Sequence, residues 1–106
     1  MEPVYISHQL SGNWRKNIKA ARLFVRAALL AGYAPVAPYL MDYDVLNEPQ
    51  DRELGLAHDL ALVPLCKELW LCGPIISPGM ADEHDKAKET DIRIRRFFTP
   101  EEVYHD

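Results

Sequence analysis

The architecture of this chain follows from one stretch, Glu68-Leu69-Trp70-Leu71-Cys72-Gly73-Pro74-Ile75-Ile76-Ser77-Pro78-Gly79-Met80-Ala81-Asp82-Glu83. Its first five residues are mostly apolar and predict a short buried strand, which Gly73-Pro74 ends. Ser77 is a good helix N-cap, and Pro78 suits the first helical position because it lacks the N–H that the first turn leaves unpaired. The stretch therefore predicts a strand, a turn and a helix in succession.

Glu83 falls in the apolar stripe of this predicted helix. Met80, Glu83 and Ala87 are spaced i, i+3 and i+7, as on a helix face that packs against a sheet. An ionised carboxylate costs roughly several kcal/mol to bury unless it is paired, hydrogen-bonded or held at raised pKa. We therefore infer a functional role for Glu83. An alternative stays open, in which His84 turns inward and Glu83 lies in water at the border of the face.

Further β-rich runs and helical patterns alternate along the chain. The other predicted strands are Pro3–Ser7, Tyr33–Ala37 and Ile92–Arg96. One further helix begins at an Asn13 cap and ends at Gly32, and another runs over Arg52–Leu65 behind an Asp51 cap. This alternation predicts an α/β fold with a doubly wound, mainly parallel, Rossmann-like sheet of four to five strands and helices on both faces, in a single domain spanning residues 1–106.

Two segments show little periodicity. Tyr39–Gln50 contains several Asp and Asn residues and is predicted to be a long loop at the edge of the sheet. The tail Phe97–Asp106 is polar and acidic, and we expect it to add an extra turn or to pack on a neighbour.

Two of the predicted loops lie where ligands bind to such sheets, beyond the carboxyl ends of the strands. Ser11 and Gly12 follow the first strand, and Ser77 and Gly79 follow the third. Each pair lies at the start of a helix, where free backbone N–H groups attract anions. Together they predict a crevice for a phosphate or carboxylate, although Ser and Gly are also common in plain turns.

Composition excludes several classes of function. The formal net charge is −4, and no run of Lys and Arg is longer than two, which argues against nucleic acid as a partner. The two cysteines are too few for a disulfide framework, so we expect a reducing cytoplasm. The apolar stretches are shorter than the roughly 20 residues that span a membrane. The chain has no dinucleotide or P-loop motif and no metal-ligand spacing of its histidines, so we expect neither a cofactor nor a metal.

The chain resembles the nucleoside 2-deoxyribosyltransferase-like superfamily, and within it the small uncharacterised domains of bacteria and phages. The resemblance extends from about Val4 to Arg95. It is carried by Val4-Tyr5-Ile6-Ser7 with Ser11-Gly12-Asn13; Ala31-Gly32-Tyr33-Ala34-Pro35-Val36-Ala37-Pro38-Tyr39-Leu40; Asp51-Arg52-Glu53-Leu54-Gly55-Leu56; and Leu69-Trp70-Leu71-Cys72-Gly73 followed by Ile76-Ser77-Pro78-Gly79-Met80-Ala81-Asp82-Glu83.

The resemblance implies a glycosidic reaction. In the characterised transferases and 2′-deoxynucleoside 5′-monophosphate N-glycosidases, the glutamate of the Ser-x-Gly-x-x-x-Glu turn attacks the anomeric carbon of deoxyribose. By this resemblance Glu83 is the nucleophile and Tyr5 helps to place it, while Ser77 and Gly79 hold the 5′ end of the sugar or its phosphate. The remaining expected substrate-binding residues are Ser7, Ser11, Gly12 and, near the base, Asp59.

The chain also departs from the family pattern. His8-Gln9 stands where relatives usually have Gly-Pro or Gly-Ser, and Ser11 stands near the position of the arginine that grips phosphate in the monophosphate glycosidases. Arg15, one helical turn further on, is a candidate replacement for that arginine.

We therefore expect a nucleoside or nucleotide N-glycosidase or 2-deoxyribosyltransferase. The alternatives are a non-catalytic binder or sensor of a nucleotide-derived signal and, from the tail alone, an accessory protein that acts by protein contact. The expected partners are a small nucleoside or nucleotide and further copies of this chain. The homo-oligomer is suggested by aromatic residues expected to be exposed. They are Trp14, Tyr39, Tyr43, Phe97 and Phe98.

Overall fold

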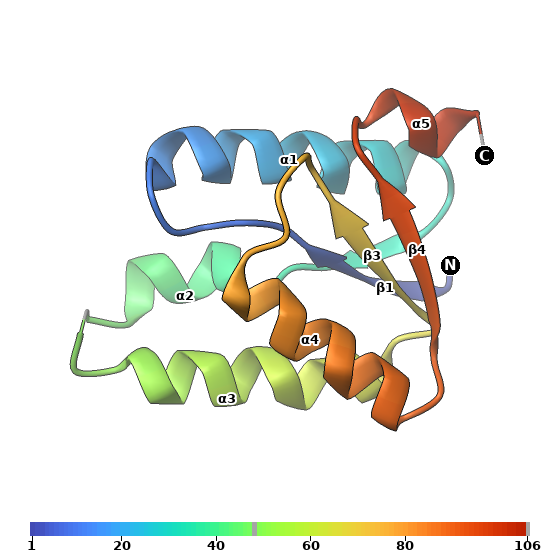
Figure 1. Ribbon diagram of the computed structural model, residues 1–106. Helices are drawn as coiled ribbons and strands as arrows, with labels where there is room; N and C mark the ends of the chain where they lie inside the picture. The colour runs from blue at the N-terminus through green and yellow to red at the C-terminus, as the bar shows by residue number, and fades with distance from the viewer. Residues whose placement is uncertain (48, 106) are drawn as a thin grey trace.

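A computed structural model describes residues 1–47 and 49–105, and its centre is a sheet of four parallel strands. The strands are β1 (Pro3–Ser7), β2 (Ala34–Val36), β3 (Glu68–Cys72) and β4 (Arg93–Phe97). Their spatial order is β2-β1-β3-β4, so the direction of winding reverses between β1 and β3 (Figure 1). Ser7 pairs with Leu71, which brings the carboxyl ends of β1 and β3 together. The predicted α/β fold is confirmed, and the sheet is entirely parallel.

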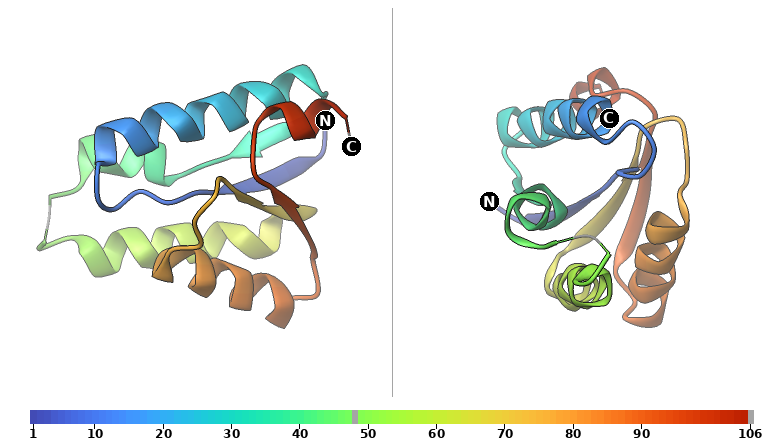
Figure 2. Two further views of the ribbon diagram at one scale, coloured as in Figure 1. Left: turned by 45° about the horizontal axis from the view of Figure 1, so that its top comes forward. Right: turned by 90° about the vertical axis from the view of Figure 1, so that its left-hand side faces the viewer.

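Helices cover both faces of this sheet (Figures 1 and 2). The helices are α1 (Trp14–Leu30), α2 (Tyr39–Val45), α3 (Arg52–Leu62), α4 (Pro78–Glu89) and α5 (Glu101–Tyr104), with a 3₁₀ turn at Val63–Leu65. α1 and α5 lie on one face, and α3 and α4 lie on the other. Within the described ranges, none of these helices has both the length and the apolar character needed to cross a bilayer.

The alternation of side chains along each strand builds two cores. One core, beneath α1, contains Val4, Ile6, Phe24, Ala27, Ala28, Trp70, Cys72, Phe97 and Val103. The other, beneath α4, contains Tyr5, Val63, Cys66, Leu69, Leu71, Met80 and Ala87. Because Val4 and Ile6 of β1 face α1, Tyr5 and Ser7 of the same strand face α4. The strand therefore presents two hydroxyl groups to the helix that carries Glu83.

The predicted loop over Tyr39–Gln50 is wrong, because α2 occupies its first half. Tyr39 is only 5% exposed, and its hydroxyl donates a hydrogen bond of 2.5 Å to the carbonyl oxygen of Ile6 in β1. This contact with the sheet anchors a helix of seven residues, which is too short to show clear periodicity. Glu48 of the predicted loop and Asp106 of the predicted tail lie outside the described residues.

Asp51 occupies the N-cap position of α3, but its side chain caps nothing in that helix. Instead Asp51 Oδ2 accepts a hydrogen bond of 2.9 Å from the backbone N–H of Asn47. Asp51 therefore lies at the predicted N-cap position, but the predicted capping hydrogen bond is wrong. Its carboxylate bonds instead to the segment that connects α2 and α3.

The expected group of exposed aromatic residues is smaller than predicted. Tyr39 and Phe97 are buried in the core, whereas Trp14 and Phe98 are about half exposed. Trp14 stacks against Tyr43 of α2, with the ring centroids 5.9 Å apart. Two of the five aromatic residues that suggested an oligomer are therefore buried inside the chain and are not available to a second copy.

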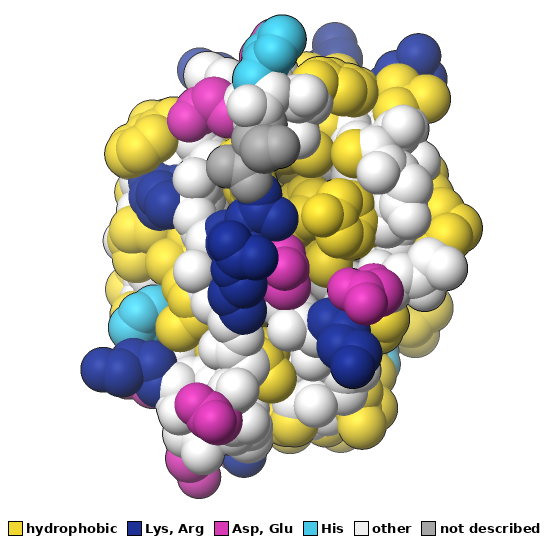
Figure 3. All heavy atoms as spheres, turned by 90° about the vertical axis from the view of Figure 1, so that its right-hand side faces the viewer, with side chains coloured by type: hydrophobic (Ala, Val, Ile, Leu, Met, Phe, Trp, Pro, Cys, Tyr) yellow, Lys and Arg dark blue, Asp and Glu magenta, His cyan; other side chains and the backbone are white. Residues whose placement is uncertain are grey.

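β4 forms one edge of the sheet and carries charged side chains along it (Figure 3). Arg93 and Arg95 place guanidinium nitrogens 3.5 and 3.3 Å from the carboxylate of Glu68 in β3. Charged side chains on an edge strand oppose pairing with a strand of another chain. This edge is therefore protected against aggregation.

Candidate functional site

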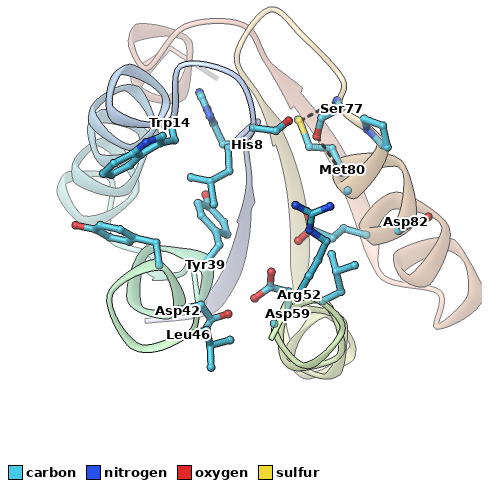
Figure 4. A pocket seen from close by; sticks show the side chains of 18 of the residues that line it. His8, Trp14, Tyr39, Asp42, Leu46, Arg52, Asp59, Ser77, Met80 and Asp82 are labelled. Atoms are coloured by element: carbon cyan, nitrogen blue, oxygen red, sulfur yellow. Dashed lines mark hydrogen bonds between the residues drawn. The ribbon is translucent and has the colours of Figure 1, made fainter. Parts of the chain in front are cut away.

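A cavity of about 660 Å³ opens at the carboxyl ends of the strands (Figure 4). Its walls come from the segments that follow β1, β2 and β3, together with α3. The lining residues used below are His8, Ser11, Gly12, Trp14, Tyr39, Asp42, Tyr43, Asp51, Arg52, Asp59, Ser77, Gly79, Met80, Asp82 and Glu83. Its volume and its place at the switch point of the sheet are typical of sites for small molecules.

Glu83 is held at the wall of this cavity by two hydroxyl groups from β1. Tyr5 donates to Oε2 at 2.5 Å, and Ser7 donates to Oε1 at 2.6 Å. Glu83 is 7% exposed and lies with Met80 and Ala87 on the buried face of α4. The alternative in which His84 turns inward is wrong, because His84 is partly exposed and its Nδ1 lies 3.4 Å from Asp85. The sheet therefore fixes the Glu83 carboxylate in one position.

Opposing effects act on the pKa of Glu83. Burial raises it, the hydrogen bonds from Ser7 and Tyr5 lower it, and the charge of Asp82 raises it, with a net pKa above the ordinary value. Burial and the negative charge of Glu83 raise the pKa of Tyr5 far above its usual range. The Tyr5 hydroxyl therefore stays protonated and can donate to Glu83 at any physiological pH.

The start of α4 brings Ser77 and Gly79 to the cavity. Ser77 is the N-cap, and its Oγ accepts a hydrogen bond of 3.3 Å from the backbone N–H of Met80. A Cβ added to Gly79 would find its nearest neighbour, Ser77 Oγ, at 4.0 Å. The glycine therefore leaves open space over the first turn of the helix.

The loop after β1 forms the opposite wall, with Ser11 and Gly12 lining the cavity. The side-chain amide of Asn17 donates to the carbonyl oxygens of Leu10 at 3.2 Å and Ser11 at 2.8 Å, and it thereby fixes the loop on α1. Arg15 lies outside the lining and stacks on the ring of Trp14 at 5.1 Å. The structure therefore gives no role in the cavity to the arginine proposed as a replacement.

The predicted site residues fall into two groups. Six of them line the same cavity: Ser11, Gly12, Asp59, Ser77, Gly79 and Glu83. Tyr5 and Ser7 are fully buried behind Glu83 and direct their hydroxyls to it. They position the carboxylate and do not line the cavity themselves.

Sequence reasoning missed Arg52 as a residue of the site. Its guanidinium points into the cavity (Figure 4), and it is the only Lys or Arg among the described residues that line the cavity. The signal was its position directly after Asp51, at the start of a helix whose N-terminus faces the carboxyl ends of the strands.

Sequence reasoning also missed a cluster formed by Asp42 of α2 with His58 and Asp59 of α3. His58 Nδ1 lies 2.8 Å from Asp42 Oδ1. Burial, a hydrogen bond with Asp42, and the charges of Asp42 and Glu83 raise the pKa of Asp59 well above its ordinary value. The sequence does not reveal this cluster, because Asp42 lies in the segment whose lack of periodicity predicts a loop.

Comparison with known proteins places the chain in a family without assigning an activity to it. None of the curated proteins compared with the chain matches it. A family model described as a domain of unknown function, DUF7768, matches residues 2–97, a range that contains all four strands and every residue lining the cavity. The chain therefore belongs to the DUF7768 family.

Proposed function

We propose that this protein cleaves the N-glycosidic bond of a 2′-deoxynucleoside or its nucleotide, as a hydrolase or a transferase, with Glu83 as the nucleophile. The observation that carries the proposal is the Glu83 carboxylate, buried at the cavity wall and held by Tyr5 and Ser7. A carboxylate fixed in this way is preorganised for attack on a sugar, because no side-chain reorientation is needed when the substrate arrives.

The proposed reaction has two displacements at C1′ of the sugar. A Glu83 oxygen forms a bond to C1′ while the C1′–N bond breaks, and the base leaves with the bonding electron pair and takes up a proton. Water or a second base then attacks C1′, the ester bond to Glu83 breaks, and the attacking group loses a proton. Each oxygen of Glu83 accepts one protein hydrogen bond and keeps another lone pair for the attack.

The charges around the cavity favour an unphosphorylated sugar. The lining contains the acids Asp42, Asp51, Asp59, Asp82 and Glu83, against Arg52 as its only Lys or Arg among the described residues. Asp42, Asp51 and Asp82 would repel a 5′-phosphate dianion even where Asp59 and Glu83, whose pKa values are raised, hold a proton, whereas a neutral 5′-hydroxyl can bond to Ser77 and to the backbone N–H of Gly79. We therefore propose a deoxynucleoside as the preferred substrate.

A second candidate function is the binding of a nucleoside or nucleotide without turnover. The raised pKa of Glu83 favours it, because a protonated carboxylic acid does not attack a sugar but can donate a hydrogen bond to a ligand. In that case the cavity recognises its ligand, and Glu83 is one of the recognition groups.

The test is release of free base from a panel of common deoxynucleosides and their 5′-monophosphates, measured by chromatography. Glu83→Gln keeps the shape of the side chain but removes the attacking charge, so base release should fall by about 10³-fold or more while binding survives. Glu89→Gln is the matched control, since Glu89 is an exposed glutamate at the end of the same helix.

A wild-type protein that releases no base from any member of the panel would contradict the proposed cleavage of the N-glycosidic bond. A thermal shift with one of the same compounds would then support the binding function.

We also propose that the protein works in a reducing cytoplasm as a homo-oligomer. Cys66 and Cys72 are both unpaired and buried, which suits a reducing compartment. Trp14 and Phe98 remain as exposed aromatic groups that a second copy would cover. Light scattering on the assayed samples tests the assembly, and a monomer mass at tens of micromolar would contradict it.

A further inference from the structure

Asp42, His58 and Asp59 converge from two helices at one side of the cavity. Asp42 belongs to α2, and the other two residues are neighbours on α3. One potential ligand atom from each residue can be chosen so that all three lie within 4.8 Å of one another. Asp42 and Asp59 line the cavity (Figure 4), whereas His58 is not among the lining residues and contacts Asp42 at 2.8 Å.

Two carboxylate oxygens of this cluster have no hydrogen-bond donor among the described residues. Asp42 Oδ2 and Asp59 Oδ1 are both sealed from solvent, and neither accepts a hydrogen bond from an N–H or hydroxyl donor of the described residues, so only a proton shared between the two carboxyl groups joins them. A buried carboxylate oxygen without a donor is costly, and here two such oxygens lie in the same cluster. Either a proton shared between the two carboxyl groups or a bound cation would satisfy both oxygens.

We propose that Asp42, His58 and Asp59 form a binding site for a divalent transition-metal ion such as Zn²⁺, Mn²⁺ or Co²⁺. Two carboxylates and an imidazole suit these ions, whereas Mg²⁺ and Ca²⁺ prefer sites built from oxygen ligands alone. Ligand bonds of about 2.0–2.2 Å place the ligand atoms of a tetrahedral site about 3.3–3.6 Å apart, so atoms as far as 4.8 Å apart must draw together by about 1 Å.

The ion would replace protons that now hold the cluster together. Binding releases to water any proton that Asp42 and Asp59 share, while His58 binds through Nδ1 as a neutral imidazole with its proton on Nε2, so no redox step is involved. Because two of the ligands line the cavity, the remaining coordination positions of the ion would face a bound molecule. The proposal does not depend on the role of Glu83, since it concerns metal affinity alone.

The direct test is isothermal titration of EDTA-treated protein with Zn²⁺, with the visible absorption of bound Co²⁺ as a second readout. We expect a single ion per chain, a higher melting temperature with Zn²⁺ than without it, and no displacement by millimolar Mg²⁺. Asp59→Asn and His58→Gln should each weaken Zn²⁺ binding by roughly a hundredfold or more.

A matched control is available on α4. His84 and Asp85 form another His–Asp pair, at 3.4 Å, with the His84 side chain 35% exposed against 37% for His58. This pair lacks the second aspartate, so His84→Gln should bind Zn²⁺ like the wild type.

Two results would overturn the metal site. The first is a wild-type protein that shows neither binding heat nor a thermal shift with Zn²⁺, Mn²⁺ or Co²⁺ at about 100 μM, which would leave a shared proton as the partner of the two carboxyl groups. The second is Zn²⁺ affinity that is unchanged in Asp59→Asn and His58→Gln but lost in His84→Gln. Circular dichroism of each variant shows whether a loss of binding comes from unfolding.

Discussion

Two groups of buried carboxylates face the same cavity, and they are satisfied in opposite ways. Glu83 receives one neutral hydroxyl donor on each of its oxygens, both from the rigid strand β1. Asp59 meets another carboxylate, Asp42, and each of the two keeps one oxygen without a donor. Burial alone therefore does not define the chemistry of an acid. Its partners decide whether it holds a charge in place or requires a proton or a cation.

The largest expected effect comes from removing a donor to Glu83. Tyr5→Phe leaves Oε2 of a buried carboxylate without its hydrogen bond, so the free energy of unfolding should fall by about 1.5–3 kcal/mol at neutral pH. The loss should be larger at alkaline than at acidic pH, because the Tyr5 hydrogen bond stabilises the ionised form of Glu83 and lowers its pKa. Urea denaturation at both pH values measures the effect.

Tyr39→Phe is the matched control, since the buried Tyr39 hydroxyl donates to the neutral carbonyl oxygen of Ile6. Its cost should be about 0.5–1.5 kcal/mol and should not vary over the same pH range. Equal losses in the two variants would mean that Glu83 carries no charge in the folded protein.

The next effect concerns Asp59 and is measured in EDTA to exclude metals. Burial and the neighbouring Asp42 raise the pKa of Asp59 from 3.8 to about 8, so the folded protein holds a proton that the unfolded chain releases between these values. The free energy of unfolding should therefore fall as the pH rises through this window. Asp59→Asn should flatten that fall, and unfolding by urea at several pH values measures the slopes.

Other titrating groups also make the free energy of unfolding depend on pH, so Asp59→Asn should reduce this dependence without removing it. Glu83 also has a raised pKa and keeps a residual slope of the same sign, while Tyr5 and Tyr39 stay protonated throughout. Asp85→Asn, at an exposed aspartate, is the control and should retain the wild-type slope. A wild-type protein that becomes more stable as the pH rises from about 4 to 8 would contradict this interpretation.

The contrast between the two groups also explains what could be predicted from the sequence. Glu83 was found because its signals are local: the Ser77 cap, Pro78 after it and the i, i+3, i+7 spacing all lie within one helix. The four strands were found for the same reason, since each is a short apolar or β-branched run between turn residues.

The cluster around Asp59 could not be predicted, because it depends on where α2 packs. α2 is fixed by the hydrogen bond from Tyr39 to Ile6, whose residues are 33 positions apart in the chain. The sequence shows neither this contact nor the turn that Asp51 closes with Asn47. Unless the packing of α2 is known, the sequence gives no position for Asp42. It therefore cannot show that the carboxyl groups of Asp42 and Asp59 lie side by side.

The smallest expected effects come from alanine substitutions at two glycines, Gly73 and Gly79, which lie on either side of the turn between β3 and α4. Gly73 has φ +88°, and a Cβ added there would meet His8 Nε2 at 3.0 Å, so Gly73→Ala should destabilise the protein by about 1–2 kcal/mol. Gly79 has no such strain and lies in the first turn of α4, so Gly79→Ala should stabilise it by about 0.4–1 kcal/mol. Thermal unfolding measures both differences.

Gly79→Ala also tests the cavity itself, because stability and binding should move in opposite directions. The added methyl group would occupy space beside Ser77 that we assign to the 5′ end of the substrate, so ligand affinity should fall while the melting temperature rises. If Gly79→Ala bound the nucleoside as tightly as the wild type, the sugar would have to lie elsewhere in the cavity, away from the start of α4.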